Sequence, residues 1–202
     1  MNYLAHACLS FGNEDILVGN MISDFIKGKK KFDYPVAIQN GIILHRMIDT
    51  FTDAHPVTKE AIKFFKPAAG SYASVFIDVV YDHFLANDKA EFPGSDLALF
   101  AETTYRILEK NNALLPERFS RMLPYMRTQN WLYNYQFATG IENSFNNIFR
   151  RANYLEKNDA VFNCFNENYE KLQNCYNQFF PELKAFSFFE YNKFVTFNTA
   201  VQ

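Results

Sequence analysis

The sequence has few of the residues and motifs that mark several common protein classes. Among its 202 residues are only three cysteines, Cys8, Cys164 and Cys175, which fall in no CxxC or zinc-finger spacing. Such an odd count argues against a disulfide scaffold and favours a reducing compartment. The seven glycines form neither GxGxxG nor a P-loop, and no GxSxG occurs. These absences argue against the common nucleotide-binding and serine-hydrolase sites.

Long apolar runs and an excess of charge are also missing. No stretch of about 18 uninterrupted apolar residues occurs, so we expect no membrane span. The N-terminus lacks a basic region followed by an apolar stretch, so we expect no signal peptide and a cytoplasmic location. The 20 basic and 22 acidic residues give a net charge of −2. This balance argues against a nucleic-acid partner.

What is present is a strong helical pattern. Apolar residues recur every three or four positions, whereas the strict alternation of a half-buried strand is nearly absent. We therefore predict an all-α fold, with residues 1–202 in one domain and an aromatic-rich core. Prolines and glycines are expected to separate the helices at residues 33–35, 53–56, 66–70 and 92–95. The predicted helices cover residues 3–10, 14–27, 35–53, 57–66, 71–87, 96–111, 116–125, 137–151, 158–180 and 182–196.

Histidines are distributed unevenly along the chain. All four, His6, His45, His55 and His83, lie within the first 83 residues. We therefore expect the chemistry to lie in residues 1–90. The C-terminal half is expected to supply packing or a partner surface.

Several His and Asp residues have spacings that suit a shared ion. His45 and Asp49 are four positions apart, which places both on one face of a helix. Asp78 and Asp82 have the same spacing. His83 follows Asp82 directly and points about a quarter-turn away, so the two share one ion only if the cavity wraps around that edge.

Two further residues complete the predicted cluster, His6 and Asp24, the latter a carboxylate within an apolar stretch. Burying such groups is unfavourable unless they are paired or bind a metal. Mixed imidazole and carboxylate ligands suit Mn²⁺, Fe²⁺ or Mg²⁺, or Zn²⁺ with fewer oxygens. Such a metal polarises a phosphoryl oxygen and lowers the pKa of a bound water. Arg46 is placed to clamp phosphate oxygens, so we predict a metal-dependent phosphodiesterase site.

Simpler interpretations exist for individual residues. A His and an Asp four apart often form a surface ion pair, Arg46 can pair with the carboxylate three residues on, and His6 can be a satisfied core histidine. We interpret His55 as structural, with Asp53 capping the next helix. Asp78 is interpreted as a residue that orients a ligand histidine.

The segments that carry these residues resemble the acyl carrier protein phosphodiesterases over nearly the whole chain. The N-terminal matches are specific in order and spacing. The matching segments are Met1-Asn2-Tyr3-Leu4-Ala5-His6, Gly19-Asn20, Asp24-Phe25, Gly41-Ile42, His45-Arg46, Ile48-Asp49, Thr52-Asp53, Asp78-Val79, Tyr81-Asp82-His83-Phe84-Leu85, Trp131-Leu132 and Phe179-Phe180-Pro181.

The resemblance implies hydrolysis of the phosphodiester that joins 4′-phosphopantetheine to a serine of holo-acyl carrier protein. Mn²⁺ is the implied metal, with Mg²⁺, Fe²⁺ or Co²⁺ as alternatives. The implied fold is an HD-domain-like helical core with added C-terminal helices, although an HD signature has Asp directly after His and this chain has His45-Arg46 and Asp82-His83. The expected metal ligands are His6, Asp24, His45, Asp82 and His83; Asp24 acts as a ligand or as the base for the attacking water, Arg46 and Asp49 assist catalysis, and Asp78 and Asp53 support the ligands.

The implied partner is holo-acyl carrier protein, a small, acidic and helical protein. We predict that it meets the basic cluster of Lys27, Lys29, Lys30 and Lys31, whose alternative interpretation is a solvated loop. Two other functions remain open from the sequence. One is an HD-like phosphohydrolase that acts on a nucleotide or another small phosphoester. The other is a non-catalytic helical module that binds a partner through its aromatic C-terminal half.

Overall fold

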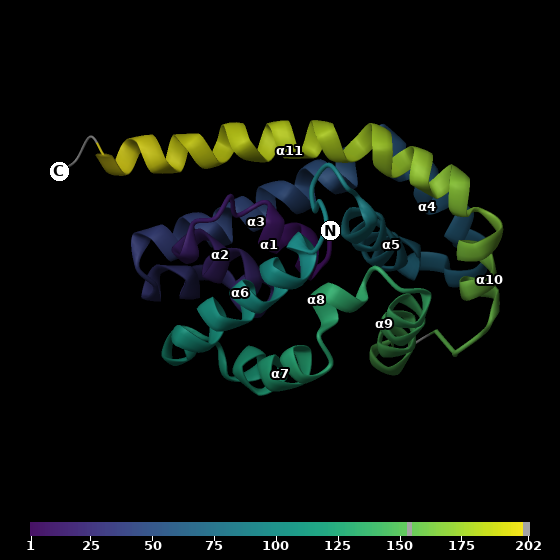
Figure 1. Cartoon of the computed structure of the whole chain (residues 1–202), viewed down its shortest axis with the longest axis horizontal. Helices are drawn as coiled ribbons and strands as arrows, with labels where there is room; N and C mark the ends of the chain where they lie inside the picture. The colour runs from purple at the N-terminus through teal and green to yellow at the C-terminus, as the bar shows by residue number, and fades with distance from the viewer. Residues whose placement is uncertain (153–154, 200–202) are drawn as a thin grey trace.

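The computed structural model describes residues 1–152 and 155–199, and every regular element in those ranges is a helix. The predicted all-α fold is therefore confirmed (Figure 1). Within those ranges, no helix combines the length and apolar character needed to cross a membrane. The α-helices are α1 (Tyr3–Cys8), α2 (Glu14–Ile22), α3 (Val36–Ala54), α4 (Pro56–Ala69), α5 (Ala73–Asn87), α6 (Asp96–Lys110), α7 (Glu117–Thr128), α8 (Trp131–Asn134), α9 (Ala138–Arg151), α10 (Ala160–Glu167) and α11 (Tyr169–Thr199), and the short 3₁₀ helices are η1 (Ser23–Phe25), η2 (Gly28–Asp33), η3 (Gly70–Tyr72) and η4 (Asn112–Leu114).

Several helix boundaries differ from those predicted. The helix expected over residues 14–27 ends at Ile22 and tightens into η1, where the Ser23 hydroxyl donates to the Ile42 carbonyl. The short helix α8 was not predicted. Proline did not break the chain as expected, because α4 continues through Pro67 and α11 continues through Pro181. Pro181 has no N–H to donate to the carbonyl of Asn177, four residues earlier. Asn177 is exposed, so water can satisfy that carbonyl.

Helices α2 and α3 make the most intimate contact in the structure, and two glycines allow it. A Cβ atom on Gly19 would lie 2.1 Å from the Ile38 carbonyl oxygen, and one on Gly41 would lie 2.4 Å from the Ile16 carbonyl oxygen. Only residues without a side chain permit backbones to approach this closely. The contact brings the middle of α2 against the first two turns of α3.

Helix α5 holds α1 in place through a buried carboxylate. Asp82 is fully buried and accepts hydrogen bonds from the backbone N–H groups of Leu4, at 2.7 Å, and Ala5, at 3.2 Å. These N–H groups belong to the first turn of α1, which has no side-chain cap of its own. A carboxylate at this end also interacts favourably with the helix dipole. Figure 1 shows the N-terminus near the centre of the molecule, with α6 to α9 along one side and α11 across the other.

Candidate metal centre and cleft

Four of the predicted site residues come together from three elements. His6 lies on α1, Asp24 on η1, and His45 and Asp49 on α3. The His6 and His45 rings stack with centroids 3.9 Å apart. His45 Nε2 lies 3.2 Å from an Asp24 oxygen and 3.1 Å from an Asp49 oxygen, and His6 Nε2 lies 3.2 Å from the other Asp49 oxygen. We call these residues the histidine–aspartate cluster.

Asn20 fixes the orientation of both rings. Its amide oxygen lies 2.9 Å from His6 Nδ1, while its amide nitrogen donates to the His6 carbonyl and to the Ser10 hydroxyl. Its backbone carbonyl lies 2.7 Å from His45 Nδ1. Both acceptors require a proton on Nδ1, so each ring directs Nε2 toward the carboxylates. Outer partners of this kind typically orient metal-binding histidines.

The two imidazoles have opposite electrostatic environments. Burial and the neighbouring His45 lower the pKa of His6 to about 4, so its ring is neutral. Burial opposes the charge on His45, but hydrogen bonds to Asp24 and Asp49 raise its pKa to about 9. The hydrogen bond from His45 in turn lowers the pKa of Asp24. The pKa of Asp49 is also lowered, since the contacts with both histidines outweigh its burial.

His6 Nε2 provides a direct test of whether a cation fits. This nitrogen is buried and has no hydrogen-bond partner among the described residues, although a carboxylate oxygen of Asp49 lies 3.2 Å away. The neutral His6 ring carries its proton on Nδ1, so the lone pair of Nε2 faces the Asp49 oxygen, which is itself an acceptor. No hydrogen lies between these two atoms. One ligand atom from each of His6, His45 and Asp49 lies within 4.8 Å of the others. Since metal–ligand bonds are about 2.0–2.2 Å long, small side-chain movements suffice for one cation to bind all three.

The amino group of Met1 and the Asp78 carboxylate border this cluster. The amine donates to Asp78 at 3.0 Å and lies 3.5 Å from Asp49. Asp78 was predicted to orient a ligand histidine, but it contacts this amine instead. Asp78 therefore acts on the cluster through the Met1 ammonium group, whose positive charge lies next to Asp49.

The prediction that Asp82 and His83 share an ion with His6 does not hold in this structure. Both Asp82 oxygens accept backbone N–H groups of α1. His83 Nδ1 lies 2.7 Å from the Tyr135 carbonyl oxygen, and Nε2 lies 3.0 Å from the Tyr169 hydroxyl. Two adjacent residues on a helix point in different directions. Here the Asp82 side chain contacts α1, whereas the His83 side chain contacts Tyr135 and Tyr169.

Other predicted residues lie outside the cluster. Arg46 is exposed and donates to the Ile26 carbonyl at 3.0 Å. Asp53 does not cap α4, because it belongs to the last turn of α3 and the N-cap residue is His55, without a side-chain bond. His55 is buried with Nε2 3.2 Å from Glu182, which suits its structural interpretation.

The lysines predicted to bind a partner lie on and beside η2. Lys27, Lys29 and Lys30 are exposed, and Lys31 is half-buried with its ammonium group 5.1 Å from the centre of the Phe32 ring. None of them lines the cleft described next. We call them the lysine segment.

A cleft of about 1140 Å³ opens at the cluster. The elements η1, α3 and α5, from the N-terminal half of the chain, line one side of it with four carboxylates, those of Asp24, Asp49, Asp53 and Asp78. Its other side carries four arginines from helices α7 and α9, which the sequence interpretation did not single out: Arg118, Arg121, Arg150 and Arg151. We call these the arginine wall. The only sequence signal for it was the presence of arginines on two amphipathic helices, which is typical of any solvated helix face.

An all-helical fold with two imidazoles and two carboxylates beside an arginine-lined cleft suits one class of protein, the phosphoester hydrolases, since such groups can hold a cation and contact phosphate oxygens. Residues 1–183 match the family model described as acyl carrier protein phosphodiesterase. Relatives that carry this name include a Klebsiella pneumoniae protein that is 31% identical, over 91% of this chain and 95% of its own length. Another, from Escherichia coli, is 30% identical, over 92% of this chain and 96% of its own length.

The chain therefore belongs to the acyl carrier protein phosphodiesterase family and is a phosphoric diester hydrolase. The expected family is confirmed, and the alternative of a non-catalytic binding module falls away. No solved structure matches the chain.

Proposed function

We propose that this protein hydrolyses the phosphodiester between 4′-phosphopantetheine and a serine of holo-acyl carrier protein, with Mn²⁺ bound at the histidine–aspartate cluster. The observation that carries the proposal is the pair of buried imidazoles whose Nδ1 atoms both bond to Asn20. Their Nε2 atoms both face the carboxylates, where a divalent cation would take the place of the proton that His45 Nε2 shares with Asp24 and Asp49. The family membership of the chain supports the choice of substrate.

The residues assigned to the metal are His6, His45, Asp49 and Asp24. A divalent cation held by them would lower the pKa of a bound water and neutralise charge on the phosphoryl oxygens. Asp24 is the most accessible member, since its side chain is 69% exposed and faces the cleft. Because its pKa is already lowered by His45, Asp24 is better suited to bind the ion and orient water than to act as a strong base.

The reaction then balances simply. The oxygen of water attacks phosphorus, the bond between phosphorus and the serine oxygen breaks, and the serine oxygen gains a proton. The phosphate stays on the pantetheine arm, and the carrier protein is released in its apo form.

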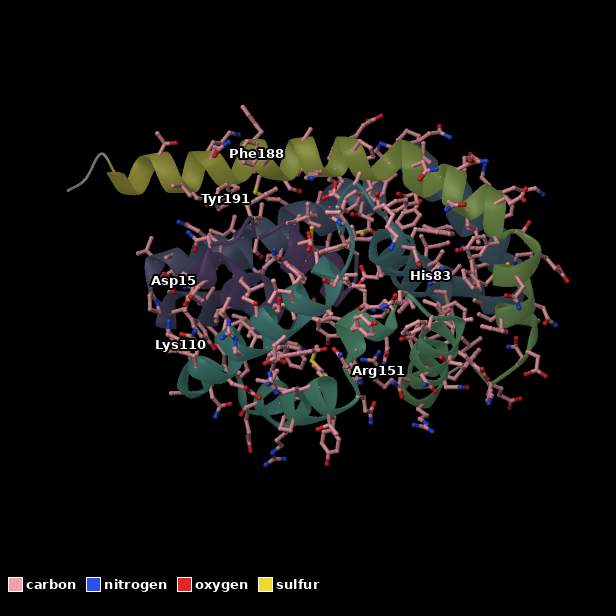
Figure 2. The ribbon with its side chains drawn as sticks, in the orientation of Figure 1. Asp15, His83, Lys110, Arg151, Phe188 and Tyr191 are labelled. Carbon is pink, nitrogen blue, oxygen red and sulfur yellow. The ribbon has the colours of Figure 1, made fainter. Side chains whose placement is uncertain are left out.

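A mass measurement tests the proposal. Protein stripped with a chelator and reloaded with Mn²⁺ is incubated with holo-acyl carrier protein, and the carrier is then weighed. We expect loss of the phosphopantetheine mass with Mn²⁺ and none without added metal. Asp24→Ala and Asp49→Asn should abolish the loss. The matched control is Asp15→Asn, an exposed carboxylate of α2 that does not line the cleft and lies well apart from Arg151 in Figure 2.

Two results would contradict the proposal. If the carrier keeps its mass while small phosphoesters are hydrolysed, the enzyme acts on a different substrate. If Asp49→Asn keeps full activity, the cluster is not the catalytic centre.

A further inference from the structure

The cleft divides its charges between two sides, and the positive side has no assigned role. The carboxylates come from η1, α3 and α5, whereas the arginine wall comes from α7 and α9. These helices belong to the half of the chain that has no histidine. The wall is thus separate in sequence from the residues that bind the metal, but it faces the same space.

Two of the arginines are linked to residues that adjoin the cluster. The guanidinium of Arg118 lies 6.0 Å from the centre of the Phe25 ring, and Phe25 directly follows Asp24. Tyr3, Asp24 and Arg151 line the same cleft, and burial and the charge of Asp24 raise the pKa of Tyr3 to about 12 whereas Arg151 lowers it. The arginine wall therefore adjoins the histidine–aspartate cluster at Phe25 and Tyr3.

Most of the wall is not neutralised from within. In the part of the chain that the structure describes, Arg118 and Arg150 form no ion pair, and Arg151 donates to the Asn147 carbonyl. Only Arg121 has a carboxylate partner, the exposed Glu117. Exposed guanidinium groups without a carboxylate partner suit anions with several oxygens, because each offers a fork of N–H donors that matches a carboxylate or phosphate.

We propose that the arginine wall is the surface that receives the acidic protein substrate, in place of the lysine segment predicted from the sequence. This inference rests on the proposed function, since it names the surface that presents the scissile phosphodiester to the cluster. Acidic side chains of the partner pair with α7 and α9, and the phosphate lies at the border between the wall and the carboxylates. A long polyanion such as nucleic acid fits less well, because the opposite side of the cleft repels it.

The experiment reverses two arginines and compares the result with matched lysine variants. Arg118→Glu/Arg150→Glu breaks no ion pair of the described structure and changes the net charge from −2 to −6. Lys59→Glu/Lys66→Glu makes the same change in charge on exposed residues of α4, outside the cleft. Lys29→Glu/Lys30→Glu tests the lysine segment. Each variant is assayed with holo-acyl carrier protein and with bis(p-nitrophenyl) phosphate, and its fold is checked by thermal unfolding.

We expect the arginine variant to lower kcat/KM for the carrier protein by about tenfold or more beyond any change on the small diester, mainly through KM. Its kcat/KM should also depend less on salt than that of the wild type. The α4 variant should behave as the wild type. A single-stranded oligonucleotide should not compete with the carrier.

Several results would overturn the inference. These are an arginine variant no weaker than the α4 variant, an equal or larger loss in the lysine-segment variant, and competition by the oligonucleotide at the carrier's own concentration. In each case the wild type still converts the carrier, so the proposed function stands. A wild type that cleaves only the small diester would instead overturn the proposed function, and this inference with it.

Discussion

Replacing Asn20 with alanine should weaken metal binding without touching a metal ligand. The fully buried side chain makes three hydrogen bonds, at 2.9 Å to His6 Nδ1, 2.8 Å to the His6 carbonyl and 3.2 Å to Ser10. Each contributes about 0.5–1.5 kcal/mol, and the buried groups left unpaired add to the loss, so we expect a destabilisation of about 3–4 kcal/mol. Freed from its acceptor, His6 can rotate or change tautomer, and metal affinity should fall about 10- to 100-fold.

Two companion variants separate orientation from stability. Asn20→Asp keeps an acceptor for His6 Nδ1 but loses both donated hydrogen bonds, so it should be destabilised while its Mn²⁺ affinity stays within about threefold of the wild type. Ser10→Ala removes the acceptor of one Asn20 hydrogen bond and the hydroxyl that donates to the His6 carbonyl, and it should cost about 1–2 kcal/mol with unchanged affinity. Calorimetric titration with Mn²⁺ and urea unfolding measure the two quantities. Wild-type affinity in Asn20→Ala would refute the claim that Asn20 orients His6.

Three other predictions follow from the packing. Gly19→Ala should destabilise by about 3 kcal/mol or more in urea unfolding, because its Cβ would lie 2.1 Å from the Ile38 carbonyl oxygen; a loss below about 1 kcal/mol would show that α2 and α3 can separate. Asp82→Ala should lose about 3 kcal/mol by urea unfolding but retain Mn²⁺ binding in the titration, whereas the reverse result would return Asp82 to the ligands. Burial lowers the pKa of His83, so its unfolded form binds more protons below about pH 6.5, and stability should fall there with decreasing pH; His83→Gln should lose less stability than the wild type between pH 7 and 5, and equal losses would contradict this assignment.

The sequence predicted the fold class and part of the cluster because both depend on local patterns. Three- and four-residue periodicity specified helices, and the spacing of His45 and Asp49 on one helix correctly placed both at the same point. The helix ends were harder to predict. Pro181 lies within α11 because the rest of that helix is held by packing against α3, α4 and α5.

The residue roles that were predicted wrongly or missed depend on contacts between segments that are distant in the sequence. Nothing local distinguishes an aspartate that binds a metal from one that caps another helix. Asp82 became a cap because the first turn of α1 lies against it, although Leu4 is 78 residues away in the sequence. Asn20 was noted only as part of the matching Gly19-Asn20 segment and was given no role, because its role comes from two hydrogen bonds to rings on different helices. The arginine wall escaped prediction for the same reason, since it exists only where α7 and α9 face the cluster.

The division between the two halves of the chain has a physical basis. The proposed metal centre needs buried, oriented ligands. Helices α1 and α3 supply His6 and His45, and α2, whose backbone approaches α3 closely at Gly19 and Gly41, supplies Asn20, which orients both rings. A surface that receives a hydrated, charged protein needs long side chains on exposed helices, which α7 and α9 supply. None of the arginines on α7 and α9 pairs with Asp24 or Asp49 in the described structure, which leaves these carboxylates for the proposed cation. A phosphodiester carried by an acidic protein is the kind of substrate that can engage both sides at once.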